Sequence, residues 1–188
     1  GGTGGRPHPD GILPVGQRYG SARTPLDPGS GGGHYPSAAY DSHAGSGGGA
    51  VRIQVAVTAA VDGTISANGE SSKGTYGAGG SGGGICITCD TFGGGTSGVI
   101  RANGGNGWAD RMSAGGGGGR VAVAYQNLAA LHAVRISASA AADEYAAADM
   151  TNRWMHAAKL GTLWVPDTAL LSGNMTDGQF PGASMTIS

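Results

Sequence analysis

Residues 47–69 read GGGAVRIQVAVTAAVDGTISANG, and this pattern returns twice further along the chain. The later copies are GGGICITCDTFGGGTSGVIRANG at 82–104 and GGGRVAVAYQNLAALHAVRISAS at 117–139. In each copy a glycine run leads into a strand of alternating apolar residues, and a second short apolar strand follows. Self-similarity at a fixed period of this length is typical of folds built from stacked repeats.

Two sets of residues measure the period of the repeat. The middle residues of the first strands are Ile53, Ile87 and Val123, which are 34 and 36 residues apart. The middle residues of the second strands are Ile65, Ile100 and Ile136, which are 35 and 36 residues apart. The connections are too short for a crossover helix, so each strand is expected to pair with its own copies. We therefore predict an all-β fold, a right-handed parallel β-helix (a solenoid) of about 3–4 coils, with both sets stacked in register in the core.

Glycine accounts for 40 of the 188 residues, and its runs lead directly into the first strands. The runs are Gly47–Gly49, Gly82–Gly84 and Gly115–Gly119. Stacking would bring them side by side, where backbones without a Cβ atom can approach closely. We therefore predict polyglycine-like layers bonded through amides and carbonyls. Valine at Gly83 or Gly117 is expected to clash with a neighbouring backbone.

The rest of the chain divides by composition. Residues 1–46 hold six of the eight prolines and are predicted to form an extended, Pro/Gly-rich N-terminal cover. Glycine-rich β-helix repeats are predicted over 47–165. Within them, the alanine-rich stretch 140–160 interrupts the pattern as an insert, either a short helix or an ordered loop.

The C-terminal part resumes strand character at GTLWV, residues 161–165, which would form a fourth coil with Leu163 in the place of Val123. Residues 166–188 are predicted to be a tail or a connector to the next module or subunit. Nothing helical or charged clearly caps the core beyond Leu163. Because a β-helix ends in unpaired strand edges, we expect head-to-tail polymers or a chain that continues into further coils.

Charge and hydropathy exclude two classes of partner. The net charge is −1, and the 11 basic residues are scattered, so no nucleic-acid surface is predicted. The apolar runs fall far short of the ~18 residues that a membrane span requires. No cofactor, metal ion or catalytic residue is predicted.

Asn68 and Asn103 occupy the same place in successive repeats, each before a glycine, with Ser139 in the third. A structural ladder of hydrogen bonds is the favoured interpretation, and a ligand-binding pair is the alternative. Trp108 and Tyr76 lie in matching loops between repeats. Their rings could stack on sugars, or they could pack in the core or an interface.

Cys86 and Cys89 form the motif C-I-T-C. In the repeat register Cys89 corresponds to Val55 and points inward, whereas Cys86 corresponds to Arg52 and points outward. Two separate thiols are therefore favoured, with a disulfide across a bend as an alternative. A zinc site is disfavoured because the chain has no second cysteine pair.

Histidines and carboxylates offer weaker hypotheses. His34 and His43 lie near Asp41, but this spacing matches no established metal motif, so we expect surface histidines. The pairs Glu70 with Lys73 and Asp110 with Arg111 lie in matching loops. Parallel β-helices that cleave acidic polysaccharides need such clusters, although solvated loops are the simpler interpretation.

The leader YGSARTPLDPGSGGG at residues 19–33, together with GGGAVRIQV, DGTISANG and GGGGGRVAVAY, resembles a known glycine-rich module. This is a parallel β-helix module of large secreted bacterial surface or adhesin-like proteins. The resemblance covers roughly residues 19–165 and departs from the pattern in the alanine-rich third copy and the 140–160 insert. The chain starts within a glycine-rich sequence and stops at an apparent strand, so we expect a processed or excised piece of a longer protein.

The resemblance implies an extracellular or cell-surface structural or adhesive module without catalytic residues. The expected partners are copies of the chain, joined head to tail, or flanking modules of a longer chain. A carbohydrate- or surface-binding module that uses loop aromatics is the alternative, and a polysaccharide-cleaving enzyme is a third possibility.

Overall fold

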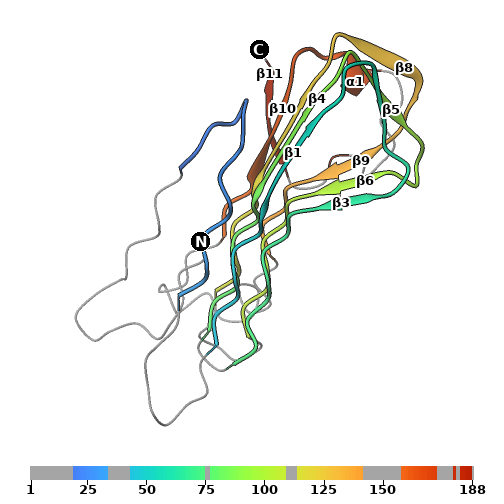
Figure 1. Cartoon of the computed structure of the whole chain (residues 1–188). Helices are drawn as coiled ribbons and strands as arrows, with labels where there is room; N and C mark the ends of the chain where they lie inside the picture. The colour runs from blue at the N-terminus through green and yellow to red at the C-terminus, as the bar shows by residue number, and fades with distance from the viewer. Residues whose placement is uncertain are drawn as a thin grey trace.

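Every repeat contributes three strands, and strands of successive repeats pair in parallel (Figure 1). The computed structural model describes residues 19–33, 43–74, 77–108, 114–141, 158–172, 180 and 183–187. The first repeat forms β1 (Ala50–Gln54), β2 (Thr58–Ala60) and β3 (Thr64–Ser66). The second forms β4 (Gly84–Thr88), β5 (Thr91–Gly94) and β6 (Val99–Arg101). The third forms β7 (Arg120–Ala124), β8 (Asn127–His132) and β9 (Arg135–Ser137).

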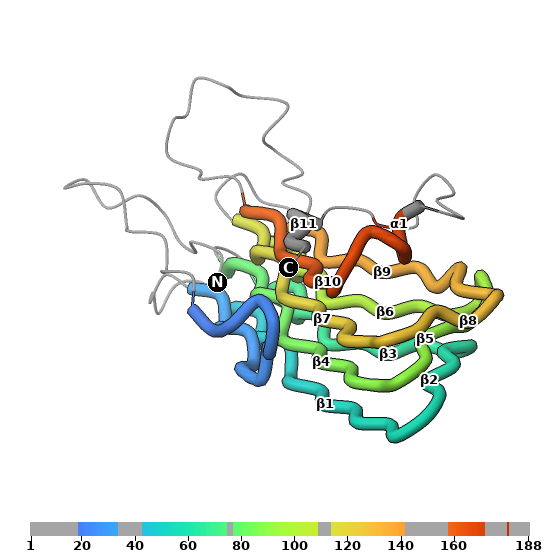
Figure 2. The backbone as a smooth tube through the Cα atoms, turned by 90° about the horizontal axis from the view of Figure 1, so that it is seen from above, coloured from blue at the N-terminus to red at the C-terminus, as the bar shows by residue number. Residues whose placement is uncertain are grey.

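The strands build three parallel sheets, which confirms the prediction of an all-β chain with parallel pairing. The sheet orders are β1-β4-β7-β10-β11, β2-β5-β8 and β3-β6-β9. In Figure 2 the strands of each sheet lie one above another, so every repeat forms one layer. The remaining elements are β10 (Gly161–Val165), the short helix α1 (Ala169–Ser172) and β11 (Ala183–Ile187).

The sequence pattern predicts two strands in each repeat, whereas the structure has three. The missed strands, β2, β5 and β8, lie in the segments interpreted as connections. Ala59 pairs with Phe92, and Phe92 pairs with Leu128, so this row also faces the core. The alternation was hidden because β2 is short and alanine-rich and β5 ends in glycines.

The register follows the period of the repeat. Ile53 pairs with Ile87, and Ile87 pairs with Val123. Ile65 pairs with Ile100, and Ile100 pairs with Ile136. The members from the second and third repeats are at most 1% exposed, whereas Ile53 and Ile65 in the first repeat are only partly buried.

The fourth strand of the large sheet is not in the expected register. Leu163 of β10 pairs with Val121 and not with Val123. The predicted pairing assumes that the repeat spacing continues across the 140–160 insert, most of which lies outside the described residues. The length of an insert does not determine which residues pair after it. The shift of two residues keeps Leu163 on the core face, because side chains alternate with a period of two.

The core beyond Leu163 has a helical cover, so the expectation that nothing helical caps this end is wrong. Leu170 of α1 is 1% exposed and joins the core cluster, with Phe180 packed against it. The Tyr125 hydroxyl donates a 2.8 Å hydrogen bond to Asp167 Oδ1, which also accepts the amide of Ala169 at the start of α1. β11 then pairs with β10 of its own chain and extends the large sheet.

Residues 19–33, called the N-terminal segment below, lie beside the large sheet, on its outer side (Figure 1). The guanidinium of Arg23 lies 5.1 Å from the ring centroid of Trp164 in β10. The guanidinium of Arg120 in β7 lies 5.7 Å from the ring centroid of Tyr19. These two contacts hold the segment against β7 and β10, and the carbonyls of Pro25 and Asp27 lie close to Gly84 at the start of β4.

Because the first repeat is less buried than the second, truncating equivalent core residues of the two repeats should lower the free energy of unfolding by different amounts. Ile87→Ala should lower the free energy of unfolding by ~2–5 kcal/mol, because it leaves a cavity between two repeats. Ile53→Ala, in register with Ile87, should cost clearly less because the side chain is already partly exposed. Urea denaturation of both variants would measure the difference, and equal costs would contradict the stacked core.

Tyr125 predicts a pH dependence of stability. Burial, with the Asp167 carboxylate second, raises the pKa of Tyr125 well above its ordinary value of 10.0. The folded chain therefore keeps this proton where the unfolded chain has lost it, so the stabilisation is complete below pH ~10 and is lost as pH rises further. Melting temperatures of the wild type should fall above pH ~10. The fall should be smaller in Tyr125→Phe, and identical profiles would contradict the assignment.

Candidate functional site

The glycine-rich segments beside the sheets form a hydrogen-bonded lattice, which is the most unusual feature of the structure. Within 78–83, amides three residues apart donate to the same neighbouring segment. Ala78 and Ser81 donate to Gly33 and Ser30, Gly79 and Gly82 to Ala114 and Gly117, and Gly80 and Gly83 to Glu70 and Ala67. All six donor–acceptor distances lie between 2.7 and 3.0 Å.

A period of three residues is that of a polyproline-II-type helix, in which successive peptide groups point in three directions. The segment 78–83 therefore bonds to neighbours on several sides, unlike a β-strand, which bonds to two. It also accepts hydrogen bonds from Gly45 and Gly48 and from Gly105. The lattice thus joins the N-terminal segment to the first three repeats.

Glycine is needed here because backbones approach closely. A Cβ atom on Gly83 would overlap the carbonyl oxygen of Gly49, and one on Gly80 would overlap that of Ser46. Among the described glycines only Gly20 and Gly94 have positive φ angles, of 82° and 140°. Left-handed backbone therefore does not explain the runs, and the absence of a side chain does.

The two glycines singled out from the sequence have different surroundings. Gly83 is enclosed by the backbone of the preceding run. A Cβ on Gly117 would meet only the carbonyl oxygen of Lys159, at 3.3 Å. Gly49, one residue before β1, would meet nothing within 4 Å.

The asparagines form a ladder of side chain to backbone bonds. Asn68 Oδ1 accepts the amide of Asn103 at 2.9 Å, and Asn103 Oδ1 accepts the amide of Ser139 at 2.9 Å. The glycine after each asparagine donates its own amide to the same partner residue, Gly69 to Asn103 and Gly104 to Ser139. Each asparagine therefore links one repeat to the next, by accepting a backbone amide.

Trp108 is the member of the predicted aromatic pair that the structure describes. Its side chain is 43% exposed, and its amide donates a 3.4 Å hydrogen bond to the carbonyl of Gly77. Tyr76 lies outside the described residues.

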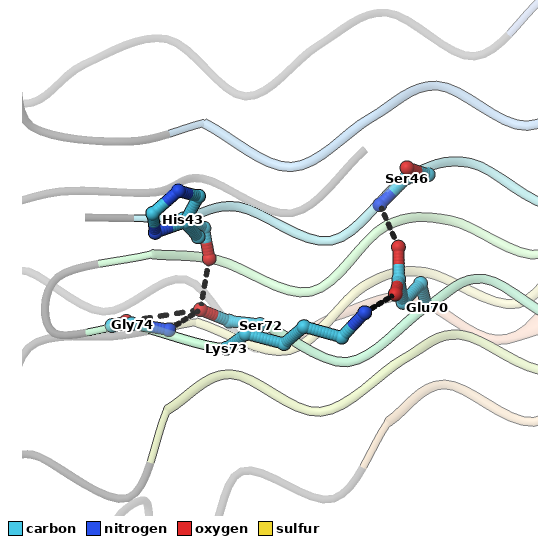
Figure 3. A network of polar contacts seen from close by, with 6 residues as sticks. All are labelled: His43, Ser46, Glu70, Ser72, Lys73 and Gly74. Atoms are coloured by element: carbon cyan, nitrogen blue, oxygen red, sulfur yellow. Dashed lines mark hydrogen bonds and ion pairs between the residues drawn. The ribbon is translucent and has the colours of Figure 1, made fainter. Parts of the chain in front are cut away.

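Glu70 and Lys73 form an exposed ion pair in a small polar network (Figure 3). Hydrogen bonds from the Lys73 ammonium and then from the Ser46 amide lower the pKa of the Glu70 carboxyl, and the bond to Glu70 raises the pKa of Lys73. The Ser72 hydroxyl donates to the carbonyl of His43 at 2.6 Å. Glu70 is thus poised to stay ionised, which is the opposite of a general acid.

The other polar hypotheses lie partly outside the described residues. Asp110, Arg111, His34 and Asp41 are among the residues that the structure does not describe. Within the described ranges, no group of three or more histidines, cysteines, aspartates or glutamates could hold a metal ion.

Cys86 in β4 and Cys89, just after its end, are buried free thiols. Cys89 belongs to the core cluster, and burial raises the pKa of its thiol. Cys86 is in the outer-face row, which continues through Ala122 to Trp164. These three residues are at most 6% exposed.

Sequence reasoning missed the contacts that join distant parts of the chain. Tyr125 with Asp167, Arg23 with Trp164, and Tyr19 with Arg120 pair residues from different segments. The repeat period does not predict such pairs, because only one residue of each pair lies in a repeat. The one available signal is Arg120 at the start of β7, because the equivalent residues of the other two repeats are Ala50 and Gly84.

Comparisons with known proteins return no match, whether against family models, curated proteins or solved structures. Among the helices of the described part of the chain, none has the length and apolar character of a membrane span.

The glycine lattice predicts a graded response to alanine. Gly83→Ala should destabilise by at least ~1–3 kcal/mol, the range for overpacking, because backbone must move to make room. Gly117→Ala should have a smaller effect, and Gly49→Ala should be close to neutral. Thermal and urea melts of the three variants would measure this order. Wild-type stability of Gly83→Ala would mean that the runs are ordinary loops.

Proposed function

We propose that this chain is an extracellular structural or adhesive module, built as a right-handed parallel β-helix with glycine-rich, polyglycine-like layers. The in-register parallel pairing of three successive repeats supports the solenoid interpretation. Right-handedness is the usual sense of parallel crossover connections. The module works without a cofactor or metal ion, in contact with copies of itself or with flanking modules.

The lattice of residues 78–83 and its neighbours carries this proposal. Its cohesion comes from peptide groups, which every repeat supplies at the same positions, and not from ionisable side chains. Only 12% of the residues are charged, and the pair Glu70 with Lys73 is exposed to solvent. An arrangement of this kind extends by adding layers, which suits a spacer or scaffold at a surface.

The N-terminal segment supports the extracellular assignment through the sequence resemblance. The leader YGSARTPLDPGSGGG is the part that bonds to the lattice through Gly29 and Gly32 and lies over the large sheet. Its residues therefore serve the architecture itself. If the leader is needed for the fold, we expect it to be present wherever this module occurs in surface proteins.

A carbohydrate-binding function is the second candidate, favoured by the exposed indole of Trp108. An aromatic face of this kind stacks on the apolar face of a sugar ring. This function would use the same scaffold as a support for one loop.

Glycan binding and catalysis assays on the whole chain separate these functions. The structural module should show neither saturable glycan binding nor turnover of polyuronates, and electron microscopy of the native material should show extended assemblies or a long parent chain. Saturable binding that Trp108→Ala abolishes and Tyr19→Ala leaves intact would favour the carbohydrate-binding module. Turnover of a polyuronate that Glu70→Gln abolishes would overturn both.

A further inference from the structure

Three asparagines of the chain are followed directly by glycine: Asn68, Asn103 and Asn106. Asparagine is thermolabile in this setting, because glycine has no side chain to shield its amide nitrogen. That nitrogen can lose its proton and attack the Cγ atom of the asparagine side chain. A new C–N bond then closes a five-membered succinimide ring, and the side-chain nitrogen leaves as ammonia. Water opens the ring to give aspartate or isoaspartate.

The two asparagines of the ladder are held away from this reaction. The Oδ1 of Asn68 accepts the amide of Asn103 at 2.9 Å, and the amide of Gly69 donates to the carbonyl of Asn103 at 2.8 Å. The same two bonds, both of 2.9 Å, tie Asn103 and Gly104 to Ser139. Ring closure requires the side chain and the following amide to turn toward each other. Both hydrogen bonds must therefore break before either ladder asparagine can react.

Asn106 has the same glycine neighbour without this protection. The residue is exposed, and in the part of the chain that the structure describes neither its side chain nor the amide of Gly107 forms a hydrogen bond. Its backbone is held from the other side. The Asn106 amide donates to Ser71 Oγ at 3.0 Å, and its carbonyl accepts the amide of Ser72 at 2.9 Å. The two reacting groups are thus free in a segment that is otherwise bound to the first repeat.

We propose that Asn106 is a self-modification site, which converts to aspartate and isoaspartate while Asn68 and Asn103 keep their amides. The substrate is the chain itself, and water is the co-reactant. The product carries a new carboxylate two residues before Trp108, and isoaspartate also lengthens the backbone there by one carbon atom. The reaction therefore alters the loop of Trp108 and leaves the ladder intact. This inference goes beyond the proposed structural function and does not depend on it.

The first experiment incubates the full chain in warm, mildly alkaline buffer made with water enriched in heavy oxygen, which marks every ring opened during the incubation. Trypsin places Asn68 in the peptide 53–73 and the other two asparagines in the peptide 102–111, where fragment ions separate them. In the folded chain Asn106 should lose its amide at least ~10-fold faster than Asn68 or Asn103, because two hydrogen bonds oppose the reaction at each of those.

The matched control is the same chain unfolded in guanidinium chloride. All three asparagines then have a glycine neighbour and no fixed partners, so their rates should converge. Hydrogen exchange of the folded chain gives a readout that does not depend on the modification. The amide of Gly107 should exchange rapidly, whereas the amides of Gly69 and Gly104 should be protected.

Two variants test the chemistry at this position. Gly107→Ala should slow the loss of the Asn106 amide, because a methyl group hinders the attacking nitrogen. Asn106→Gln should abolish it, because the longer side chain would have to close a less favourable six-membered ring. Ion-exchange chromatography of the incubated wild type should show acidic forms that are absent from Asn106→Gln. Circular dichroism of both variants checks that they are folded.

Either of two results would overturn the proposal. Equal rates at the three asparagines of the folded chain would show that the ladder gives no protection. Retention of the Asn106 amide in the folded chain, under conditions in which the unfolded chain loses it, would show that the fold protects this position as well. The proposed structural function fails only through glycan binding or turnover, so the two failures are distinguishable.

Discussion

The structure depends on close contact between the backbones of glycine residues, which have no side chain. Where residues 78–83 meet their neighbours, the amides donate to carbonyls on three sides, and the four glycines of the stretch have no room for a Cβ atom. The entropic cost of ordering glycine is about 0.5–1 kcal/mol relative to alanine, and a hydrogen bond contributes a net ~1 kcal/mol. A glycine segment is therefore stable only when nearly all of its peptide groups are bonded. This constraint explains why the lattice is continuous from one repeat to the next.

The apolar core and the lattice stabilise each other. The sheets fix the spacing between repeats through rows such as Ile65, Ile100 and Ile136, and that spacing sets the distance between the glycine segments. The asparagine ladder joins the two regions, because Asn103 lies just after β6 and bonds to the repeats on both sides. A change that tilts one repeat would disturb both kinds of contact at once.

The repeat period predicted most of this arrangement. Equal intervals between equivalent apolar residues determine which residues pair, and the glycine runs indicated where backbones meet. The period carries no information where it is interrupted or where a contact occurs only once in the chain. The register of Leu163 cannot be predicted from the period because an insert precedes it. The pattern of β2 is not recognisable because the strand is short and rich in alanine. The cover formed by Leu170 has no counterpart in the repeats. The roles of Trp108 and Tyr76 stay predictions, because exposure alone does not identify a ligand.

The position of the N-terminal segment has a consequence for the order of folding. Tyr19 and Arg23 are made before their partners: Arg120, the cationic partner of Tyr19, lies 101 residues later in the chain, and Trp164, the aromatic partner of Arg23, lies 141 residues later. Contacts between residues so far apart form late, because the intervening chain must be ordered before they can be made. The end of this segment that holds Gly29 and Gly32 bonds to Gly48 and Gly45 and can dock once the first repeat exists, whereas the contacts of Tyr19 and Arg23 must wait for β7 and β10.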